Sequence, residues 1–263
     1  MAKSLIIASV AAFSLAVATG AQAARVKVLV SGAMAHALQD ISEDFTKKNG
    51  HTLDFQVGTT GVVQDKVRQG EKADIVEVTS AGMDQLEKEK LVMPGTRVEL
   101  ARALIGVAVK DGSAMPDIST PGALKQRLQS ARAVAYIDPK VGGQAGAAIM
   151  GLLSKLGIAD EVVKKSVYGK TGAEAVQKMA AGEADIALSF ISEILPIKGA
   201  KAVGPVPMLV QNPSQYAAAI GSASANPAVA RDLIKAMQSA EAKRVMVNAG
   251  LEPVTDGVQP IRK

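Results

Sequence analysis

The sequence has 263 residues, of which 48% are hydrophobic and 21% are charged, a composition typical of a globular protein with one large domain or two modest lobes. The net charge is +5, and Lys and Arg are scattered among few aromatic residues; this excludes the clustered basic face with interleaved aromatics that nucleic-acid binding requires. The absence of Cys excludes disulfides and thiol chemistry.

Residues 1–23 have the pattern of a cleaved signal peptide. Lys3 gives a positive start, residues 5–18 form an apolar run, and Ala21 and Ala23 form the small-x-small pattern that signal peptidase reads. The run is too short for a membrane anchor, which needs roughly 20 apolar residues. The sequence therefore predicts a periplasmic protein that does not insert into the membrane after the signal peptide is removed.

Short β-branched runs alternate with amphipathic stretches from the start of the mature chain. Apolar residues at three- and four-residue spacing, such as Met34, Leu38 and Phe45, predict helices. We expect strands at residues 26–30, 53–57 and 74–79, and helices over residues 34–49, 62–69 and 83–90. This series predicts a parallel sheet with helices on both faces.

The same plan restarts in the second half of the chain. A strand at residues 103–109 leads into it, and residues 203–210 cross back toward the first half. Between these crossings we expect strands at residues 133–137, 162–168 and 185–189, and helices at residues 144–156 and 171–181. Residues 226–250 read as one or two closing helices.

These elements predict an α/β fold of two Rossmann-like lobes. The sheets should be mixed but mainly parallel, and crossing strands should form a hinge between them. The first lobe is expected over residues 24–105 plus the C-terminal part, and the second over residues 106–210. A cleft should lie between the two lobes.

Six loops rich in Gly, Ser and Thr are expected where strands end. They lie at residues 31–33, 58–61, 79–82, 141–146, 170–172 and 189–192. In open α/β sheets ligands bind beyond the carboxyl ends of the strands, where helix starts present unpaired N–H groups and a partial positive charge. Taken singly, such residues are ordinary helix caps; together they predict a site for a small anion that uses no cationic side chain.

Candidates for catalysis are few. His36 lies near the first helix start and could face the cleft, whereas His51 sits in a turn. No paired-histidine spacing, GxSxG elbow or GxxxxGK[ST] loop is present, so we expect no metal and no cofactor. Glu193 is either a hinge or surface residue or a proton-handling group in the cleft.

These loops, in this order, resemble the periplasmic molybdate-binding proteins of ABC importers, a branch of the type II solute-binding fold. The stretches that carry the resemblance are residues 28–38, 55–69, 73–86, 133–157 and 182–193. The resemblance implies a periplasmic-binding-protein-like region over residues 24–263, a monomer, and an ABC permease as partner.

The resemblance also implies an oxyanion held by two hydroxyls, backbone amides and a tyrosine. The first hydroxyl position falls on Ala33, with Ser31 and Gly32 before it, and the second falls on Thr59, beside Thr60. Only the second of these positions carries a hydroxyl in this chain.

The backbone-amide positions fall near Ser80, Ala145 and Gly172. The tyrosine position falls on Phe190, which has no hydroxyl, and Gln144 and Ser189 stand nearby as replacements. A cavity that leaves an oxyanion oxygen unpaired loses about 1–3 kcal/mol per missing bond. We therefore expect a different and larger anion, such as a small organic polycarboxylate.

A second function of another class stays open. Aconitate isomerase is an enzyme similar to the same family, and it shifts a double bond in a tricarboxylate by proton transfer. Such chemistry needs a base beside a cradle for carboxylates, and His36 and Glu193 are the candidates for that base. The first function remains capture of a small anion, either an oxyanion or a small organic polycarboxylate, for an ABC importer.

Overall fold

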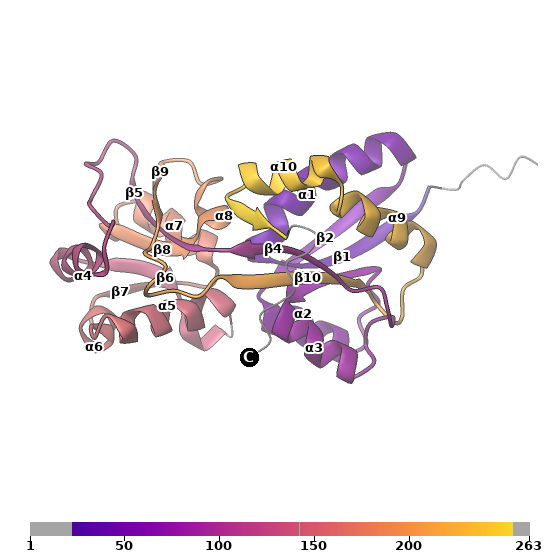
Figure 1. Cartoon of the computed structure of the whole chain (residues 1–263), viewed down its shortest axis with the longest axis horizontal. Helices are drawn as coiled ribbons and strands as arrows, with labels where there is room; N and C mark the ends of the chain where they lie inside the picture. Colours follow the sequence, from indigo (N-terminus) through magenta and orange to yellow (C-terminus); the bar gives the residue numbers. More distant parts are fainter. Residues whose placement is uncertain (1–22, 142, 255–263) are drawn as a thin grey trace, which may run out of the picture.

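The computed structural model describes residues 23–141 and 143–254. The predicted signal peptide, apart from its last residue, lies outside them. The described chain forms two lobes side by side, each built on its own mixed sheet with flanking helices (Figure 1). The predicted α/β fold of two lobes with mixed sheets is confirmed. The expectation that the sheets are mainly parallel is wrong for the described residues, because five of their nine strand pairs are antiparallel.

Six strands form the sheet of the first lobe, in the order β11-β4-β10-β3-β1-β2. They are β1 (Arg25–Ser31), β2 (Thr52–Gly58), β3 (Ile75–Thr79), β4 (Val98–Ala103), β10 (Ser214–Ile220) and β11 (Leu251–Pro253). The helices of this lobe are α1 (Gly32–Asn49), α2 (Thr60–Arg68), α3 (Ser80–Lys88), α9 (Pro227–Met237) and α10 (Ala240–Asn248). β1 pairs in parallel with β2 and β3, whereas β10 runs antiparallel between β3 and β4.

Five strands form the sheet of the second lobe, in the order β7-β6-β8-β5-β9. They are β5 (Ile105–Lys110), β6 (Val134–Ile137), β7 (Ser166–Gly169), β8 (Ile186–Phe190) and β9 (Ala200–Pro205). The helices are α4 (Pro121–Ser130), the 3₁₀ turn η1 (Pro139–Val141), α5 (Gln144–Lys155), α6 (Ala159–Val163), α7 (Gly172–Ala180) and α8 (Ile191–Ile194). β6 pairs in parallel with β7 and β8, and β5 runs antiparallel to β8 and β9.

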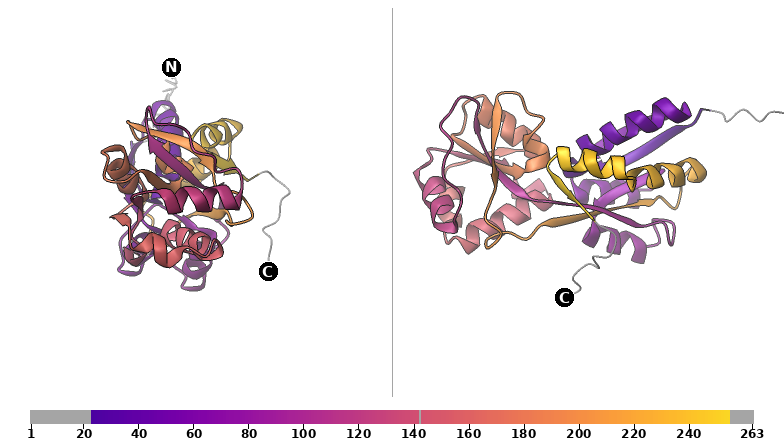
Figure 2. Two further views of the ribbon diagram at one scale, coloured as in Figure 1. Left: turned by 90° about the vertical axis from the view of Figure 1, so that its left-hand side faces the viewer. Right: turned by 45° about the horizontal axis from the view of Figure 1, so that its top comes forward.

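The chain crosses between the lobes twice, and both crossings are visible in Figures 1 and 2. Only Leu104 separates β4 from β5, and residues 206–213 lead from β9 back to β10. The buried Gln211 side chain joins the two crossings: its Oε1 accepts from the Ile105 N–H at 2.9 Å, and its Nε2 donates to the Val206 carbonyl at 2.6 Å. The crossings are therefore one hydrogen-bonded unit.

Apolar periodicity explains why the helices cover the sheets. The buried positions of α1 include Met34, Leu38, Ile41 and Phe45, which fall on one face at three- and four-residue spacing. The two closing helices expected near the C-terminus are α9 and α10, and the Ser239 hydroxyl begins α10 by accepting from the Ala242 N–H at 3.1 Å.

Two of the expected strands are wrong in part. Residues 162–165 lie in the end of α6 and the turn after it, because residues 160 and 161 are acidic and favour a first helical turn. The run at 203–210 ends as a strand at Pro205, since Pro207 has no N–H for a strand ladder.

Some elements were not predicted. The return crossing strand is β10, whose Ala-rich sequence lacks the β-branched signal of a strand. Helices α4 and α8 and the short strand β11 were also missed. The run at 103–109 is divided at Leu104 between two sheets, which hydrophobic periodicity alone does not reveal.

Candidate functional site

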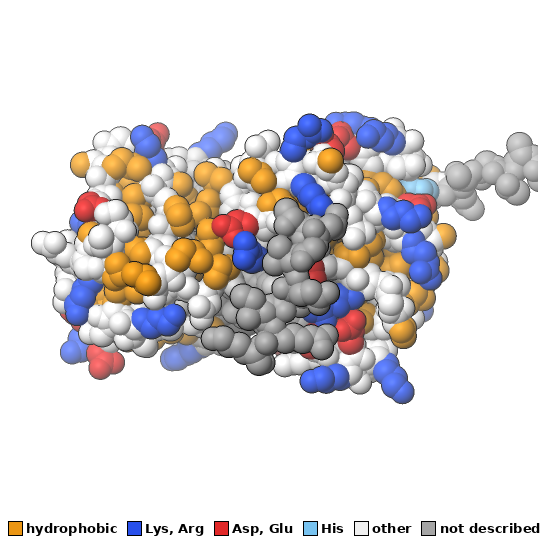
Figure 3. Space-filling model, in the orientation of Figure 1, with side chains coloured by type: hydrophobic (Ala, Val, Ile, Leu, Met, Phe, Trp, Pro, Cys, Tyr) orange, Lys and Arg blue, Asp and Glu red, His pale blue; other side chains and the backbone are white. Residues whose placement is uncertain are grey.

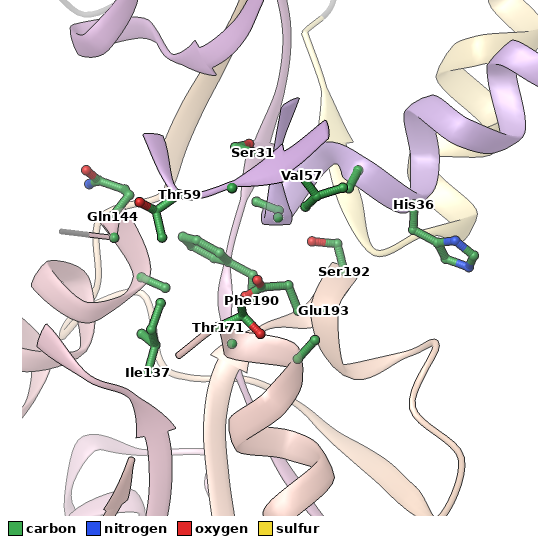
Figure 4. Close-up of a pocket in the computed structure, with 18 of the residues that line it drawn as sticks. Ser31, His36, Val57, Thr59, Ile137, Gln144, Thr171, Phe190, Ser192 and Glu193 are labelled. Atoms are coloured by element: carbon green, nitrogen blue, oxygen red, sulfur yellow. The ribbon is translucent and has the colours of Figure 1, made fainter. Parts of the chain in front are cut away.

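A cavity of about 250 Å³ lies between the two sheets. The starts of α1 and α2 line it from the first lobe, and the starts of α5, α7 and α8 line it from the second (Figure 4). Each of these helices begins after a strand or turn at the carboxyl end of its sheet, where α/β folds bind ligands. The cavity is therefore the candidate site.

Most of the positions expected to bind the ligand line this cavity. They are Ser31, Gly32, Ala33, Thr59, Thr60, Gln144, Ala145, Gly172 and Phe190. Five of the six predicted loops thus meet in one place, and they come from both lobes.

Two expected ligand positions do not line the cavity. Ser80 lies at the start of α3, and its hydroxyl donates to Glu99 Oε2 at 2.5 Å. The fully buried Ser189 lies behind the cavity wall, and its hydroxyl donates to Glu193 Oε2 at 2.8 Å. The structure therefore places neither hydroxyl on the cavity wall, and each donates to a glutamate side chain instead.

Two long helices, α1 and α5, begin at the cavity without a side-chain cap. Ser31 precedes α1 and Gly143 precedes α5, and neither forms a capping side-chain hydrogen bond. The Ser31 hydroxyl is buried and has no hydrogen-bond partner. The two helix starts come from opposite lobes, so their free N–H groups and partial positive charges face one shared space.

The starts of α2 and α7 are capped, whereas the short helix α8 has no side-chain cap. Thr59 Oγ1 accepts from the Val62 N–H at 3.3 Å, and Thr171 Oγ1 accepts from the Glu174 N–H at 3.0 Å. Thr59 Oγ1 also lies 3.5 Å from the Val141 carbonyl, so this side chain bridges the lobes. Thr59 is therefore both a helix cap and part of the cavity wall.

The cavity contains one acidic side chain. Glu193 lines it from α8 and is only 9% exposed. Burial raises the pKa of its carboxyl, against the hydrogen bond from Ser189, which favours the charged form. No Lys or Arg lines the cavity among the described residues.

Two glycines make room for the Glu193 carboxylate. A Cβ at Gly32 would lie 2.7 Å from Oε1, and a Cβ at Gly172 would overlap Oε2 and the Ser189 hydroxyl. Because Gly32 begins α1 and Gly172 begins α7, the carboxylate lies against the backbone of both lobes. Glycine is required at both positions for this close approach.

A second buried carboxyl lies behind Ser31. Glu77 in β3 is fully buried and accepts from the Ser31 N–H at 2.7 Å, while its Oε1 has no partner. Burial raises the pKa of Glu77 to about 8, even though the Ser31 N–H favours the charged form. The Ser31 N–H is thus occupied inside the protein, and the Ser31 hydroxyl is buried at the cavity wall.

Tyr216 and Ser192 also line the cavity and were not singled out by the sequence. Tyr216 comes from the crossing strand β10, and its ring packs edge-on against Phe190, with centroids 6.1 Å apart. Burial, with the nearby carboxyls of Glu77 and Glu193, raises the pKa of the phenol. Sequence reasoning missed Tyr216 because the strand that carries it, β10, was not recognised. The Ser192 hydroxyl, like that of Ser31, is buried without a hydrogen-bond partner.

The two candidate bases occupy different positions. His36 is exposed at the mouth of the cavity, and in Figure 4 its ring points away from the other labelled side chains. Glu193 lies inside the cavity. The sequence left open whether it is a hinge or surface residue or a residue of the cleft, and the structure places it in the cleft.

Other features of the described chain concern metals, membranes and charge. Within residues 23–141 and 143–254, no group of three or more His, Cys, Asp or Glu side chains is arranged to hold a metal ion. No helix in those same ranges has the length and apolar character to cross a membrane. On the face seen in Figure 3, Lys and Arg side chains are spread over both lobes.

Known proteins resemble the chain in sequence over most of its length. An aconitate isomerase from a Pseudomonas species is 30% identical over 236 residues, which cover 86% of this chain and 87% of that protein. The molybdate-binding protein ModA of Azotobacter vinelandii is 27% identical over 178 residues, covering 67% and 69% of the two chains.

Solved structures share the fold. The periplasmic molybdate-binding protein of Azotobacter vinelandii superposes with a TM-score of 0.73 at 21% identity, covering 89% of this chain and 99% of that one. The substrate-binding domain of a molybdenum ABC transporter from Clostridium difficile gives a TM-score of 0.69 at 19% identity, with coverage of 89% and 100%.

The decisive comparison is with a protein family. The family described as bacterial extracellular solute-binding protein matches residues 26–252, which include both sheets and every wall of the cavity. The chain belongs to the bacterial extracellular solute-binding protein family.

Proposed function

We propose that this protein binds a small organic polycarboxylate in the cavity between its lobes and delivers it to an ABC permease. The observation that carries the proposal is the pair of uncapped helix starts, at α1 and α5, that face one cavity from opposite lobes. Such helix starts bind oxyanions through backbone N–H groups without cationic side chains. Contacts from both lobes to one ligand would favour the conformation in which the lobes meet.

The side chains of the cavity favour a carboxylate over a compact tetrahedral oxyanion. Phe190 and Ala33 supply no hydroxyl, so two positions offer only apolar surface. The free hydroxyls of Ser31 and Ser192 and the phenol of Tyr216 suit a ligand with several separate polar groups and a carbon skeleton between them. The Glu193 carboxyl would repel an oxyanion that carries no proton.

A thermal-shift screen followed by calorimetry tests this proposal. The screen compares citrate, cis-aconitate and trans-aconitate with sulfate, phosphate, molybdate and tungstate. A ligand at 100 times its Kd adds about 2.7 kcal/mol to the free energy of unfolding, which corresponds to a Tm rise of roughly 5–10 °C for a chain of this size. We expect this rise with a polycarboxylate; a rise with micromolar molybdate alone would refute the choice of ligand.

A second candidate function is isomerisation of aconitate. Two observations favour it: the aconitate isomerase is 30% identical to this chain, and Glu193 places a carboxyl of raised pKa inside the cavity. A general base with a pKa closer to neutral transfers protons efficiently at physiological pH. In this function Glu193 would move a proton between two carbons of the bound acid, and His36 at the mouth would not take part.

Turnover separates the two functions. Wild-type protein at catalytic concentration is incubated with cis-aconitate, and trans-aconitate is measured by chromatography. Conversion that Glu193→Gln abolishes, while binding of cis-aconitate persists, supports the isomerase. Unchanged cis-aconitate after many equivalents supports the transport function.

We also propose that the protein acts as a monomer in the periplasm after cleavage of residues 1–23. The pattern in those residues and the extracellular character of the family support this location. Cell fractionation with mass spectrometry of the mature N-terminus tests it, and gel filtration with light scattering tests the monomer. A protein that remains in the cytoplasm with Met1 attached would contradict the proposed role in import.

A further inference from the structure

The cavity presents an unbalanced set of charges to an anion. Glu193 lies inside it, Glu77 lies behind Ser31, and no Lys or Arg lines it among the described residues. Within the same part of the chain, Glu193 forms no ion pair; its one side-chain partner is the Ser189 hydroxyl. A bound polycarboxylate would therefore meet a carboxyl group with no cation to screen the two.

The groups around Glu193 do not change this balance. α8 packs against α1, α7, β5, β8 and β9. The titratable side chains nearest the cavity on these elements are His36 of α1, which is exposed at the mouth, and Glu174 of α7, whose carboxylate pairs with Lys178 at 3.5 Å. Lys110 of β5 and Lys201 of β9 are exposed, and β8 has no titratable side chain.

Beyond these elements, Glu77 and the Tyr216 phenol are buried in the same region, and the carboxyls of Glu77 and Glu193 both act on that phenol. Both carry negative charge when they ionise, so each disfavours a second negative charge beside it. Glu77 and Tyr216 thus both favour the neutral form of Glu193.

We propose that Glu193 and a carboxylate of the bound ligand share one proton, which is taken up from solution on binding. This inference rests on the proposed function and deepens it, because it names how the cavity selects among anions. The carboxyl already lies at the junction of α1 and α7, where Gly32 and Gly172 leave room for its two oxygens. With one proton between them, the ligand oxygen and the Glu193 oxygen form a short, charge-assisted hydrogen bond in place of a repulsive contact.

Shared protonation makes the site selective for weak acids. A carboxylate readily accepts or shares a proton near neutral pH, whereas sulfate, the anion of a strong acid, does not. Burial raises the pKa of Glu193 and so also favours a proton on its carboxyl. Sulfate would meet an ionised or unshared Glu193 and would be rejected, while a polycarboxylate would be retained.

Calorimetry of trans-aconitate binding tests the proposal. Titrations are run between about pH 6 and 8.5, where the free probe is fully ionised, in buffers of different ionisation enthalpy. Above the pKa of Glu193 we expect uptake that approaches one proton per ligand and an affinity that falls toward tenfold per pH unit. Binding without proton uptake would overturn the proposal and leave the proposed function intact.

Three variants make the result specific. Glu193→Gln keeps an acceptor for Ser189 and a neutral donor for the ligand, so it should bind trans-aconitate with no dependence on pH over this range. Ser189→Ala removes the hydrogen bond that favours the charged carboxyl, so the fall in affinity should move to higher pH. Glu43→Gln, which removes a negative charge from the exposed face of α1, should behave as wild type.

The outcomes separate this inference from the proposed function. If Glu193→Gln keeps the pH dependence of wild type, another group takes up the proton and the inference is wrong. If sulfate binds as tightly as trans-aconitate across the same pH range, the selectivity argument fails. If neither the wild type nor Glu193→Gln binds any of the anions in the screen, the proposed function fails and this inference with it.

Discussion

At the residue scale, the cavity depends on two glycines that have no Cβ atom. Gly32 and Gly172 allow the Glu193 carboxyl to lie where it does, because a methyl group at either position would collide with it. Glycine at a helix start is usually explained by capping or turn geometry. Here the glycines hold a side chain from α8 against the starts of α1 and α7.

Replacing Gly172 by Ala should displace Glu193 and weaken binding. The new Cβ would overlap both Glu193 Oε2 and the Ser189 hydroxyl, and overpacking of this kind costs about 1–3 kcal/mol. We expect a loss of trans-aconitate affinity of tenfold or more by calorimetry. Combining the change with Glu193→Ala should remove the overlap with Glu193, leave the overlap with the Ser189 hydroxyl, and so restore part of the free energy of unfolding.

Gly151→Ala is the matched control for that prediction. Gly151 lies on α5 with nothing within 4 Å of its missing Cβ. The same substitution should stabilise the helix by about 1 kcal/mol without changing affinity. An equal loss of affinity in both variants would show that Gly172 has no special relation to Glu193.

Glu77 should make stability depend on pH. Its pKa is raised from 4.5 to about 8 in the folded protein, so the folded state holds the proton more tightly than the unfolded state. The stabilisation is present below about pH 4.5 and is lost as pH rises toward 8. Glu77→Gln should therefore match wild type near pH 5 and exceed its Tm by several degrees near pH 8.5.

Thermal unfolding followed by circular dichroism measures this difference. Glu43→Gln, with its exposed carboxyl, provides the control and should stay within about 0.5 kcal/mol of wild type at each pH. A constant difference between wild type and Glu77→Gln from pH 5 to 8.5 would contradict the raised pKa.

At the element scale, the hinge is a pair of crossings tied by one side chain. Gln211→Ala would leave the Ile105 N–H and the Val206 carbonyl without their partner. Buried unpaired groups cost about 1–3 kcal/mol each. We expect urea denaturation to show a loss of free energy of unfolding of that order. Gln238→Ala, at the exposed end of α9, should change it little.

Much of the element order could be predicted because local pattern and tertiary structure agree. β1 and α1 follow from β-branched alternation and three–four spacing around Met34 and Leu38. β10 could not be predicted, since its run of three Ala residues becomes a strand only through pairing with β3 and β4. The sequence therefore did not reveal that Tyr216, which lies on β10, belongs to the hinge and the cavity.

The candidate site was predictable at its backbone positions and not at its side chains. Loop chemistry identified the helix starts near Ser31, Thr59 and Gly172, which line the cavity. Side-chain direction remained open: Ser189 and Glu193 are four residues apart, yet one lies behind the wall and the other inside it. Tertiary packing decides such directions, and single-sequence patterns do not contain it.

At the scale of the whole molecule, binding should protect both lobes at once. The starts of α1 and α5 belong to different sheets but border the same cavity. Trans-aconitate should slow amide hydrogen exchange at both helix starts, and the outer helices α4 and α9 should be unaffected. Protection confined to one lobe, measured by mass spectrometry, would contradict a ligand held between them.

The position of β10 also governs when the molecule can be completed during synthesis. This strand lies between β3 and β4 in the middle of the first sheet, although it begins only at Ser214. A nascent polypeptide that ends before it therefore leaves two strand edges unpaired, whereas the strands of the second sheet are all available by Pro205. The lobe that starts first is finished last, and the chain stays unfolded in part until nearly all of it has been made.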